Sequence, residues 1–306
     1  MRILFMGTPE FAVASLRGLT EAGHCICGVF TQPDKPKNRG HKLAFSPVKE
    51  YALEKGLPVY QPVTLRGEEA LELARSLNPA LTVVAAYGKL LPVEILNVPP
   101  LGSINVHSSL LPKYRGAAPI NWAILNGETE TGVTIMHMAK ELDAGDVILQ
   151  RKTAIGENED AQALTGRLAE LGAEALLEVV AALGAGTAGR TPQDHSRYTY
   201  APMLDKSMSP VNWTRSAHEI HCQIRGLIPW PCASTDVISG SSMKLFAALE
   251  TGTETTAFPG VVVAAGKQGI DVACGDGKVL RITELQAAGG KRMGAGAYLL
   301  GNPISR

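Results

Sequence analysis

The sequence predicts an α/β protein in which a doubly wound domain with a parallel sheet is followed by a small β-barrel. Apolar runs typical of buried strands alternate with helical patterns through the first half of the chain. Beyond Trp213, short apolar segments separated by turn residues replace this alternation, as is typical of a small barrel. The length of 306 residues suits two domains of roughly 100–200 residues each.

The first strand is predicted at Arg2–Met6, because its apolar run stops at the turn residues Gly7, Thr8 and Pro9. Further strands are expected at residues 27–31, 81–86, 103–107, 132–138 and 147–150, and helices at 11–22, 68–77 and 164–183. Strands that alternate with helices in this way predict a parallel sheet covered on both faces.

A stretch rich in proline, glycine and polar residues separates the two halves and is interpreted as a linker. We expect one domain over residues 1–189, a linker over 190–205 and a second domain over 206–306. The second domain is expected to hold a short helix at 216–224 and strands at 237–238, 243–246, 260–264, 270–273 and 279–282.

Composition excludes several classes of protein. Basic and acidic residues are equal in number, 29 each, so a globally basic nucleic-acid-binding protein is not indicated, although a local basic patch stays open. No apolar run approaches the roughly 20 residues of a membrane span, and the first glycine comes too early for a signal peptide. Five scattered cysteines without a CxxC pair are expected to be reduced thiols. These features predict a cytoplasmic protein without membrane contact.

Asn105 and His107 are polar residues on a strand that is otherwise expected to be buried. Side chains alternate along a strand, so both point to one face while Ile104 and Val106 point to the other. Both lie near the strand's carboxyl end, and ligands of doubly wound sheets bind outside those ends. The spacing leaves two interpretations about equally open: a functional pair, or a hydrogen-bonded histidine and asparagine in the core.

Two loops could complete a site. Residues 108–116 begin with serines and continue with apolar residues, an arrangement that would suit a flat heteroaromatic ligand, although an ordinary connection is the alternative. Asp143 and Asp146 lie between two later strands. Either could support His107 electrostatically, and either could only shape the turn, so the spacing does not choose between them.

Two common cofactor classes are not expected. The first strand ends in Gly7-Thr8-Pro9, which lacks the GxGxxG spacing of a dinucleotide site, so a nicotinamide cofactor is not predicted. His218 and His221 are three residues apart, but no further ligand at suitable spacing completes a metal site.

The loop after the second strand is rich in basic residues. From Asp34 to Lys49, five basic residues against one acidic residue leave a net charge of +4. Such side chains could meet phosphates, while a solvated loop is the alternative. From Lys206 to Arg306, ten basic against seven acidic residues leave +3, enough for a basic stripe.

Together these motifs resemble the folate-dependent formyltransferases. The resemblance is carried by Ser103–Pro112, Arg115–Ile120 and Leu142–Asp146, which hold an Asn…His…Asp pattern shared by several members. Other segments, in order along essentially the whole chain, resemble the members whose acceptor is a charged initiator tRNA. These segments are residues 7–12, 31–34, 39–40, 46–49, 86–88, 224–227, 229–231, 285–286 and 290–293.

The resemblance implies a Rossmann-like catalytic domain, a linker, and an OB-like C-terminal domain that binds tRNA. It also implies 10-formyltetrahydrofolate as formyl donor, the methionine amine of initiator Met-tRNA as acceptor, and a monomer. The implied folate-binding residues are Ser109, Leu110, Leu111, Pro112, Ala86, Tyr87 and Gly88. The implied tRNA-binding residues are Arg39, Lys35, Lys37, Lys42, Lys206, Lys291 and Arg292.

The implied catalytic residues are Asn105, His107 and Asp143. The amide of Asn105 would donate to the oxyanion that forms when an amine attacks the formyl carbon. His107 would transfer protons or support that oxyanion, and Asp143 would hold His107 in the useful tautomer. The chemistry requires neither a covalent enzyme intermediate nor a metal.

Three positions depart from the pattern: Lys35 stands where arginine is common, Met203 replaces a lysine, and Ser207 replaces a glutamate. These departures concern RNA contacts rather than the chemistry. Two alternative functions are a formyltransferase acting on an amino-sugar nucleotide, which would share Asn105, His107 and Asp143, and a catalytically silent RNA-binding protein.

Overall fold

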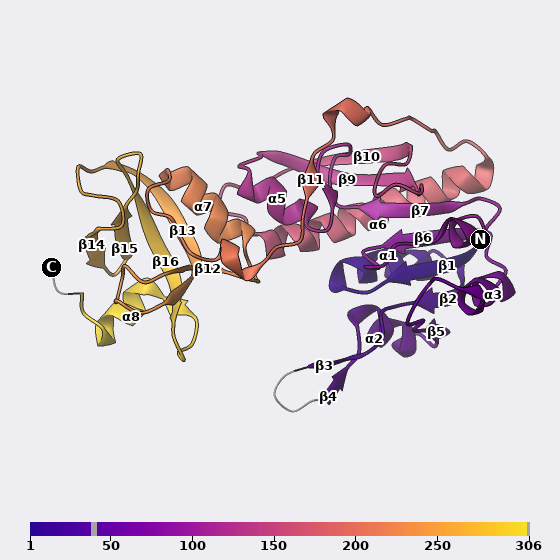
Figure 1. Cartoon of the computed structure of the whole chain (residues 1–306), viewed down its shortest axis with the longest axis horizontal. Helices are drawn as coiled ribbons and strands as arrows, with labels where there is room; N and C mark the ends of the chain where they lie inside the picture. Colours follow the sequence, from indigo (N-terminus) through magenta and orange to yellow (C-terminus); the bar gives the residue numbers. More distant parts are fainter. Residues whose placement is uncertain (38–41, 305–306) are drawn as a thin grey trace. The chain divides into compact units, whose positions relative to one another are not determined.

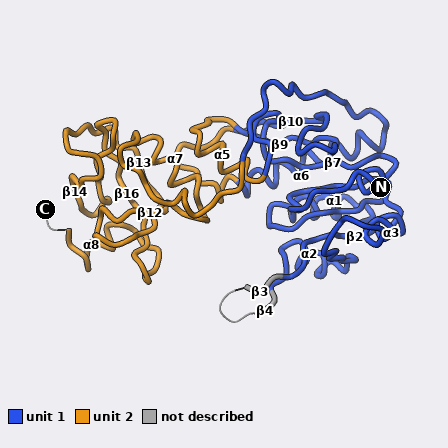
Figure 2. Tube along the Cα trace, viewed as in Figure 1, with its two compact units in different colours: residues 1–116, 131–153, 165–201 blue, residues 117–130, 154–164, 202–306 orange. Residues whose placement is uncertain are grey.

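The structure, a computed structural model, describes residues 1–37 and 42–304. The chain forms two compact units (Figure 2). The first unit comprises residues 1–116, 131–153 and 165–201, and the second comprises residues 117–130, 154–164 and 202–306. The chain therefore enters the second unit twice before its final passage into it.

The first unit is built on a seven-stranded sheet in the order β10-β9-β7-β6-β1-β2-β5 (Figure 1). Strands β7 to β5 are parallel neighbours, and β9 runs antiparallel to β7. The strands are β1 (Arg2–Gly7), β2 (Cys25–Phe30), β5 (Val59–Tyr60), β6 (Leu81–Ala85), β7 (Ser103–His107), β9 (Glu130–His137) and β10 (Val147–Ala154). The predicted α/β domain with a parallel sheet is confirmed.

Helices cover both faces of this sheet. They are α1 (Glu10–Glu21), α2 (Pro47–Glu54), α3 (Glu68–Ser76), α4 (Val93–Leu96) and α6 (Ala161–Ala185). On one face α6 packs so closely that a Cβ on Gly172 would lie 2.9 Å from Val106. On the other face, Leu4, Met6 and Val84 pack with the apolar side of α3. Because Val106 faces α6, its neighbours Asn105 and His107 face the opposite side.

Two short strand pairs accompany the main sheet. β3 (Lys35–Lys37) and β4 (Lys42–Ala44) form an antiparallel hairpin. β8 (Arg115–Gly116) pairs in parallel with β11 (Tyr200–Ala201), which is preceded by the short 3-10 helix η1 (His195–Arg197). The segment interpreted as a linker therefore pairs with the chain just beyond β7.

The second unit contains an antiparallel sheet in the order β12-β13-β16-β15-β14, and β17 pairs with β16. Its elements are α5 (Pro119–Leu125), η2 (Lys206–Met208), α7 (Ala217–Gly226), β12 (Ala233–Thr235), β13 (Met243–Glu254), β14 (Val262–Gly266), β15 (Gly269–Ala273), β16 (Lys278–Ala287), β17 (Met293–Gly294) and α8 (Ala295–Gly301). The predicted C-terminal β domain is confirmed. The strand predicted at 237–238 is wrong, because the backbone carbonyl of Asp236 closes a turn there by accepting from the amide of Gly240.

Helix α5 and residues 154–164 pack within the second unit, although the sequence suggested that the first domain is continuous to residue 189. The side chain of Asn121 donates to the carbonyl of Gly226, at 2.8 Å, and Arg225 donates to the carbonyl of Glu159, at 2.9 Å. Such contacts bring together segments far apart in the sequence, which local patterns do not reveal. The boundaries at 189 and 206 stay a prediction.

Across the described ranges, no helix combines the length and apolar character needed to cross a bilayer.

Candidate functional site

The carboxyl ends of β6 and β7 lie side by side, because the two strands are parallel neighbours with Ala85 opposite Val106. His107 is the last residue of β7, and Asn105 lies two residues before it. Their exposed fractions are 6% and 9%. The prediction that these two side chains share one face at the strand's carboxyl end is confirmed.

The hydrogen bonds of His107 define its tautomer. Its Nε2 lies 2.9 Å from the backbone carbonyl oxygen of Tyr114. A carbonyl only accepts, so Nε2 carries the proton, and the Nδ1 of a neutral His107 is left with a lone pair. This Nδ1 lies 3.8 Å from Oδ2 of Asp143, too far for a hydrogen bond. Tyr114, rather than Asp143 as predicted, therefore sets the tautomer.

Asp143 is held with its carboxylate toward His107. Its Oδ2 accepts a hydrogen bond from the backbone amide of Gly116, at 2.9 Å. By contrast, Asp146 forms an ion pair with Arg190 at the surface. The spacing could not separate these two acids, but the structure places only Asp143 beside His107.

Gln193 supports the loop that carries Asp143. Its side-chain amide nitrogen donates to the carbonyls of Asp143 and Gly145, at 2.9 and 2.7 Å, and its oxygen accepts from Arg115, at 2.7 Å. Gln193 is buried, with 6% of its surface exposed. No local pattern signals this role, because one glutamine in a polar, proline-containing stretch looks like any solvated linker residue.

Gly145, whose carbonyl accepts from Gln193, lies very close to the backbone of β9. A Cβ at this position would lie 1.8 Å from the carbonyl oxygen of His137. Only glycine therefore fits here, and this explains the glycine two residues after Asp143 in the Leu142–Asp146 motif.

The side chain of Asn105 is available to a ligand. Within the described part of the chain, no protein group hydrogen-bonds its amide, and its atoms are not among the fully buried polar atoms without a partner. Its neighbours across the sheet are Val84 and Met136, neither of which has a side chain that would compete strongly for the amide. An NH2 donor therefore stands free on the same face as His107.

The loop 109–112 is fixed from the neighbouring strands. The hydroxyl of Thr134 donates to the carbonyl of Ser109 and accepts from the amide of Leu111, while Gln150 donates to the carbonyl of Leu111. Ser109 is fully buried, and its hydroxyl donates to the carbonyl of Lys113 at 2.7 Å. Ser109 therefore shapes the loop, whereas the partly exposed Leu110 and Pro112 can meet a ligand.

The loop 86–88 lies next to it, beyond β6. Thr8 and Gln32 both donate to the carbonyl of Tyr87, at 3.0 and 3.1 Å. The ring of Tyr87 is 1% exposed and packs in the core, and burial raises the pKa of its phenol to about 12. Ala86 and Gly88 are exposed. Of this predicted trio, Tyr87 faces the interior and the other two face solvent.

Backbone strain gathers around these loops. Ala86, Tyr114 and Asp143 have φ values of 45°, 61° and 49°, a region that residues other than glycine seldom adopt. Strained backbone of this kind persists where the surroundings enforce it, and it is concentrated at functional sites.

The predicted tRNA-binding residues are scattered over several elements. Arg39 lies outside the described residues, and Lys35, Lys37 and Lys42 belong to the hairpin β3–β4. Lys206 and Lys291 are exposed. Arg292 forms an ion pair with Glu284 and lies over the ring of Phe246, so part of its charge is already balanced.

Comparison with known sequences gives matches along the whole chain. The family described as "Formyl transferase" matches residues 1–180, and "Formyl transferase, C-terminal domain" matches residues 203–303. A protein of Trichlorobacter lovleyi named methionyl-tRNA formyltransferase is 49% identical over 305 residues, which cover 99% of this chain and 95% of that protein. A protein of the same name from Caldanaerobacter subterraneus subsp. tengcongensis is 50% identical over 305 residues, with 99% and 98% covered.

Solved structures share the fold at lower identity. An N-formyltransferase from Helicobacter canadensis, in complex with folinic acid and dTDP-3-aminofucose, matches with a TM-score of 0.68 and 20% identity, covering 92% of this chain and 98% of that one. HypX from Aquifex aeolicus, in complex with tetrahydrofolic acid, matches with a TM-score of 0.64 and 21% identity, covering 98% of this chain and 47% of that one.

Proposed function

Because the chain belongs to the formyl transferase family, we propose that it transfers the formyl group of 10-formyltetrahydrofolate to the free amine of the methionine on initiator Met-tRNA. The main support for this chemistry is the position of Nδ1 of His107, which faces the carboxylate of Asp143. The amide of Asn105, which has no hydrogen-bond partner among the described residues, lies on the same face of the sheet. The choice of acceptor is supported by relatives of about half identity over nearly their whole length, named methionyl-tRNA formyltransferase.

The acceptor amine attacks the formyl carbon in its neutral form. A new C–N bond forms, the carbonyl oxygen becomes an oxyanion, and the attacking nitrogen becomes positive. The Nε2–H of His107 already donates to Tyr114, so a neutral His107 has no N–H left for the oxyanion. Oxyanion support is therefore assigned to Asn105, whose amide donates and has no protein acceptor among the described residues.

His107 is assigned to proton transfer. Its Nδ1 accepts the proton that the attacking nitrogen must lose, and the resulting imidazolium is stabilised by the carboxylate of Asp143, 3.8 Å away. The tetrahedral centre then collapses, the bond to the folate nitrogen breaks, and this nitrogen takes the proton from Nδ1. The amide of Gly116 donates to Oδ2 of Asp143 and so holds this carboxylate on the side of Nδ1 during the transfer.

The donor is assigned to the two loops beyond β6 and β7. The exposed backbone of Ala86 and Gly88 and the partly exposed Leu110 and Pro112 offer polar groups and apolar surface to a flat pterin ring. Ser109, Leu111 and Tyr87 hold these loops in shape from within. Solved relatives of the fold whose titles name folinic acid and tetrahydrofolic acid support a folate donor.

The decisive experiment is a formylation assay with the purified chain, 10-formyltetrahydrofolate and charged initiator Met-tRNA. We expect formyl-methionyl-tRNA, detected by mass spectrometry after deacylation. A dTDP-linked amino sugar and charged elongator Met-tRNA serve as competing acceptors. If only the amino sugar were formylated, the alternative activity would replace the proposed one. If no acceptor were formylated, the chain would be a catalytically silent member.

A further inference from the structure

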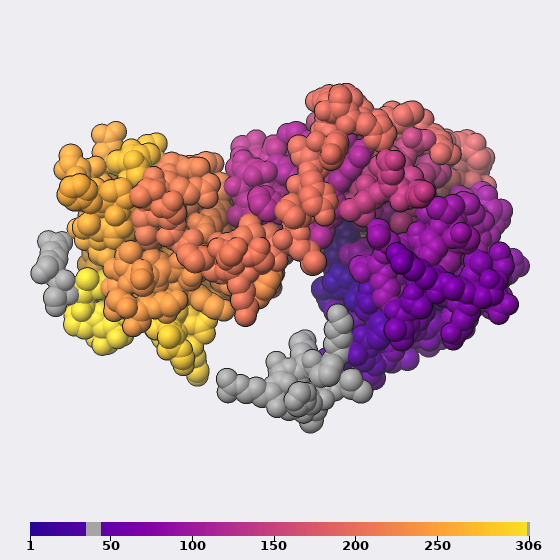
Figure 3. Space-filling model, in the orientation of Figure 1, coloured from indigo at the N-terminus to yellow at the C-terminus, as the bar shows by residue number. Residues whose placement is uncertain are grey.

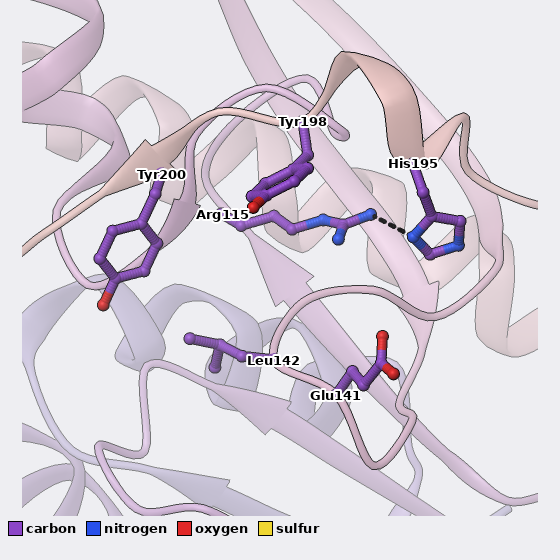
Figure 4. Close-up of a pocket in the computed structure, with 6 residues that line it drawn as sticks. All are labelled: Arg115, Glu141, Leu142, His195, Tyr198 and Tyr200. Atoms are coloured by element: carbon purple, nitrogen blue, oxygen red, sulfur yellow. Dashed lines mark hydrogen bonds between the residues drawn. The ribbon is translucent and has the colours of Figure 1, made fainter.

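A pocket of about 340 Å³ lies on the first unit (Figure 4). Leu142, in its wall, directly precedes Asp143, and Arg115 directly precedes Gly116, whose amide binds the Asp143 carboxylate. The pocket is lined by Arg115, Glu141, Leu142, His195, Tyr198 and Tyr200. Two lining residues are therefore direct chain neighbours of Asp143 and of the residue that binds its carboxylate, although Asn105, His107 and Asp143 do not line the pocket.

Two tyrosines present open aromatic rings on one side of this pocket. Tyr198 and Tyr200 are 56% and 58% exposed, and they are two residues apart on extended chain, so their side chains leave the same face. Thr199 between them points inward, where its hydroxyl accepts from the amide of Tyr114 at 2.8 Å. This part of the chain lies on the surface of the first unit (Figure 3). Exposed rings on such a strand are a stacking surface for nucleic-acid bases.

Arg115 places a positive charge at the back of the pocket. It is 7% exposed, and among the described residues no carboxylate lies within ion-pair distance of it. Its Nε and Nη2 are engaged by Gln193 and His195, and the ring of Tyr198 lies 5.2 Å from it. In Figure 4 its other terminal nitrogen points toward the side of Leu142 and Glu141. A buried guanidinium without a counter-ion favours a ligand that carries a phosphate.

Tyr200 contacts β8, the strand whose Gly116 binds the carboxylate of Asp143. Tyr200 pairs with Arg115 along β8 and β11, and its ring lies so close to Gly116 that a Cβ there would be 2.7 Å from it. A base resting on these rings is therefore held next to the residue that anchors Asp143.

We propose that this pocket binds the 3′-terminal nucleotide of the charged tRNA, with its base stacked on Tyr198 and Tyr200 and its phosphate toward Arg115. The inference rests on the proposed function, because that nucleotide carries the methionyl ester whose amine is formylated. A methionine side chain, the competing occupant, is apolar and makes no use of the buried charge of Arg115.

Binding is tested first with adenosine 5′-monophosphate as the probe, by ligand-observed NMR or calorimetry. Tyr198→Ala should weaken its binding about 5- to 100-fold, as expected for the loss of one base stack. Tyr198→Phe should bind it normally, because the ring is kept. Phe258→Ala removes an aromatic residue that is 82% exposed outside the pocket and should change nothing. Equal binding by Tyr198→Ala and the wild type would overturn the proposal, as would equal binding of adenosine and its monophosphate by the wild type.

The second test compares 3′-O-methionyl-adenosine with methionine methyl ester as formyl acceptors. Tyr198→Ala should raise KM for the nucleoside ester about 5- to 100-fold and leave the methyl ester unaffected. Equal losses on both esters would place the methionine side chain in the pocket and overturn the proposal. If the wild type formylated no charged tRNA, both proposals would fall. If the wild type formylated charged tRNA but Tyr198→Ala kept a normal KM for the nucleoside ester, only the pocket proposal would fall.

Discussion

At the scale of single residues, the proposed mechanism gives proton transfer to His107 and oxyanion support to Asn105. The Nε2 of His107 is bonded to the carbonyl of Tyr114, so this nitrogen fixes the ring and does not reach the substrate. The Nδ1 is the only ring nitrogen left for chemistry. Asn105, two residues earlier on the same strand, supplies the donor that the histidine lacks.

Asn105→Ala is expected to lower kcat about 10²- to 10³-fold, the usual loss for one oxyanion donor. KM for folate should change little, because the amide acts on the transition state rather than on the bound donor. Asn105→Asp should be at least as slow, since a carboxylate repels the oxyanion. Steady-state kinetics, with circular dichroism to verify folding, measure this. A loss below about threefold in Asn105→Ala would contradict the oxyanion role.

His107→Ala is expected to lower kcat about 10²- to 10⁴-fold. Asp143→Asn keeps an oxygen for the amide of Gly116 but loses the charge that stabilises the imidazolium, so it should also slow turnover. Steady-state kinetics at one pH, with circular dichroism to verify folding, check this pair. Turnover of His107→Ala within about threefold of the wild type would contradict the assignment of proton transfer to His107.

At the scale of elements, the site depends on a segment that returns to the sheet after α6. Gln193 and the pair β8–β11 bring residues 193–201 against Arg115, Gly116 and the Asp143 loop. The catalytic loop is therefore held on both sides: by the amide of Gly116 at the carboxylate of Asp143, and by Gln193 at its backbone.

Gln193→Leu should free this loop. Two buried carbonyls lose their donor, each at a cost of about 1–3 kcal/mol in the free energy of unfolding, and misplacement of Asp143 can slow turnover by up to about 10²-fold. Gln193→Glu still offers Arg115 an acceptor but no donor to the carbonyls. Turnover should therefore fall in both variants, as measured by kinetics beside urea unfolding. Normal turnover in Gln193→Glu would show that Arg115, and not the loop, depends on Gln193.

The sequence predicted the elements whose information is local. Apolar runs located β1, β6 and β7, and the alternation of side chains along a strand was enough to place Asn105 and His107 on one face. The partners of those side chains were not predictable in the same way. The carbonyl of Tyr114, the amide of Gly116 and the side chain of Gln193 act through backbone geometry or long-range packing, which no residue type reveals.

The same limit applies to α5, which the sequence left unassigned. Its pattern is short and apolar, and its packing partner α7 lies much later in the chain. The hydrogen bond from Asn121 to Gly226 joins residues 105 positions apart. At Ile238 the opposite happened: a strand was predicted where the structure has none. Ile238 is buried like a strand residue, yet it lies in a turn, because burial and strand pairing are separate properties.

At the scale of the whole molecule, the second unit depends on two insertions from earlier in the chain. A fragment of residues 202–306 lacks α5 and residues 154–164. Arg225, 6% exposed, would lose its carbonyl acceptors at Gly156 and Glu159, and Gly226 would lose its contact with Leu125.

We expect this fragment to unfold at lower urea concentration than the same region in the full chain, and to bind a hydrophobic dye. Asn121→Ala in the full chain removes one hydrogen bond only and should cost about 0.5–1.5 kcal/mol. Tryptophan fluorescence of Trp213, in the core of this unit, follows the transition. A fragment as stable as the full chain would show that residues 202–306 form an independent domain.

The pair β8–β11 also has a consequence for biosynthesis. It joins parts of the chain separated by 85 residues, as between Tyr114 and Thr199. Contacts of such long range form after local ones, and a chain on the ribosome emerges from its N-terminus first. The nascent chain can therefore complete the sheet, with Asn105 and His107 in place, before Gln193 and the pair β8–β11 hold the loop that carries Asp143. Under the proposed mechanism, catalytic competence therefore begins only once residue 201 has left the ribosome and residues 193–201 have docked.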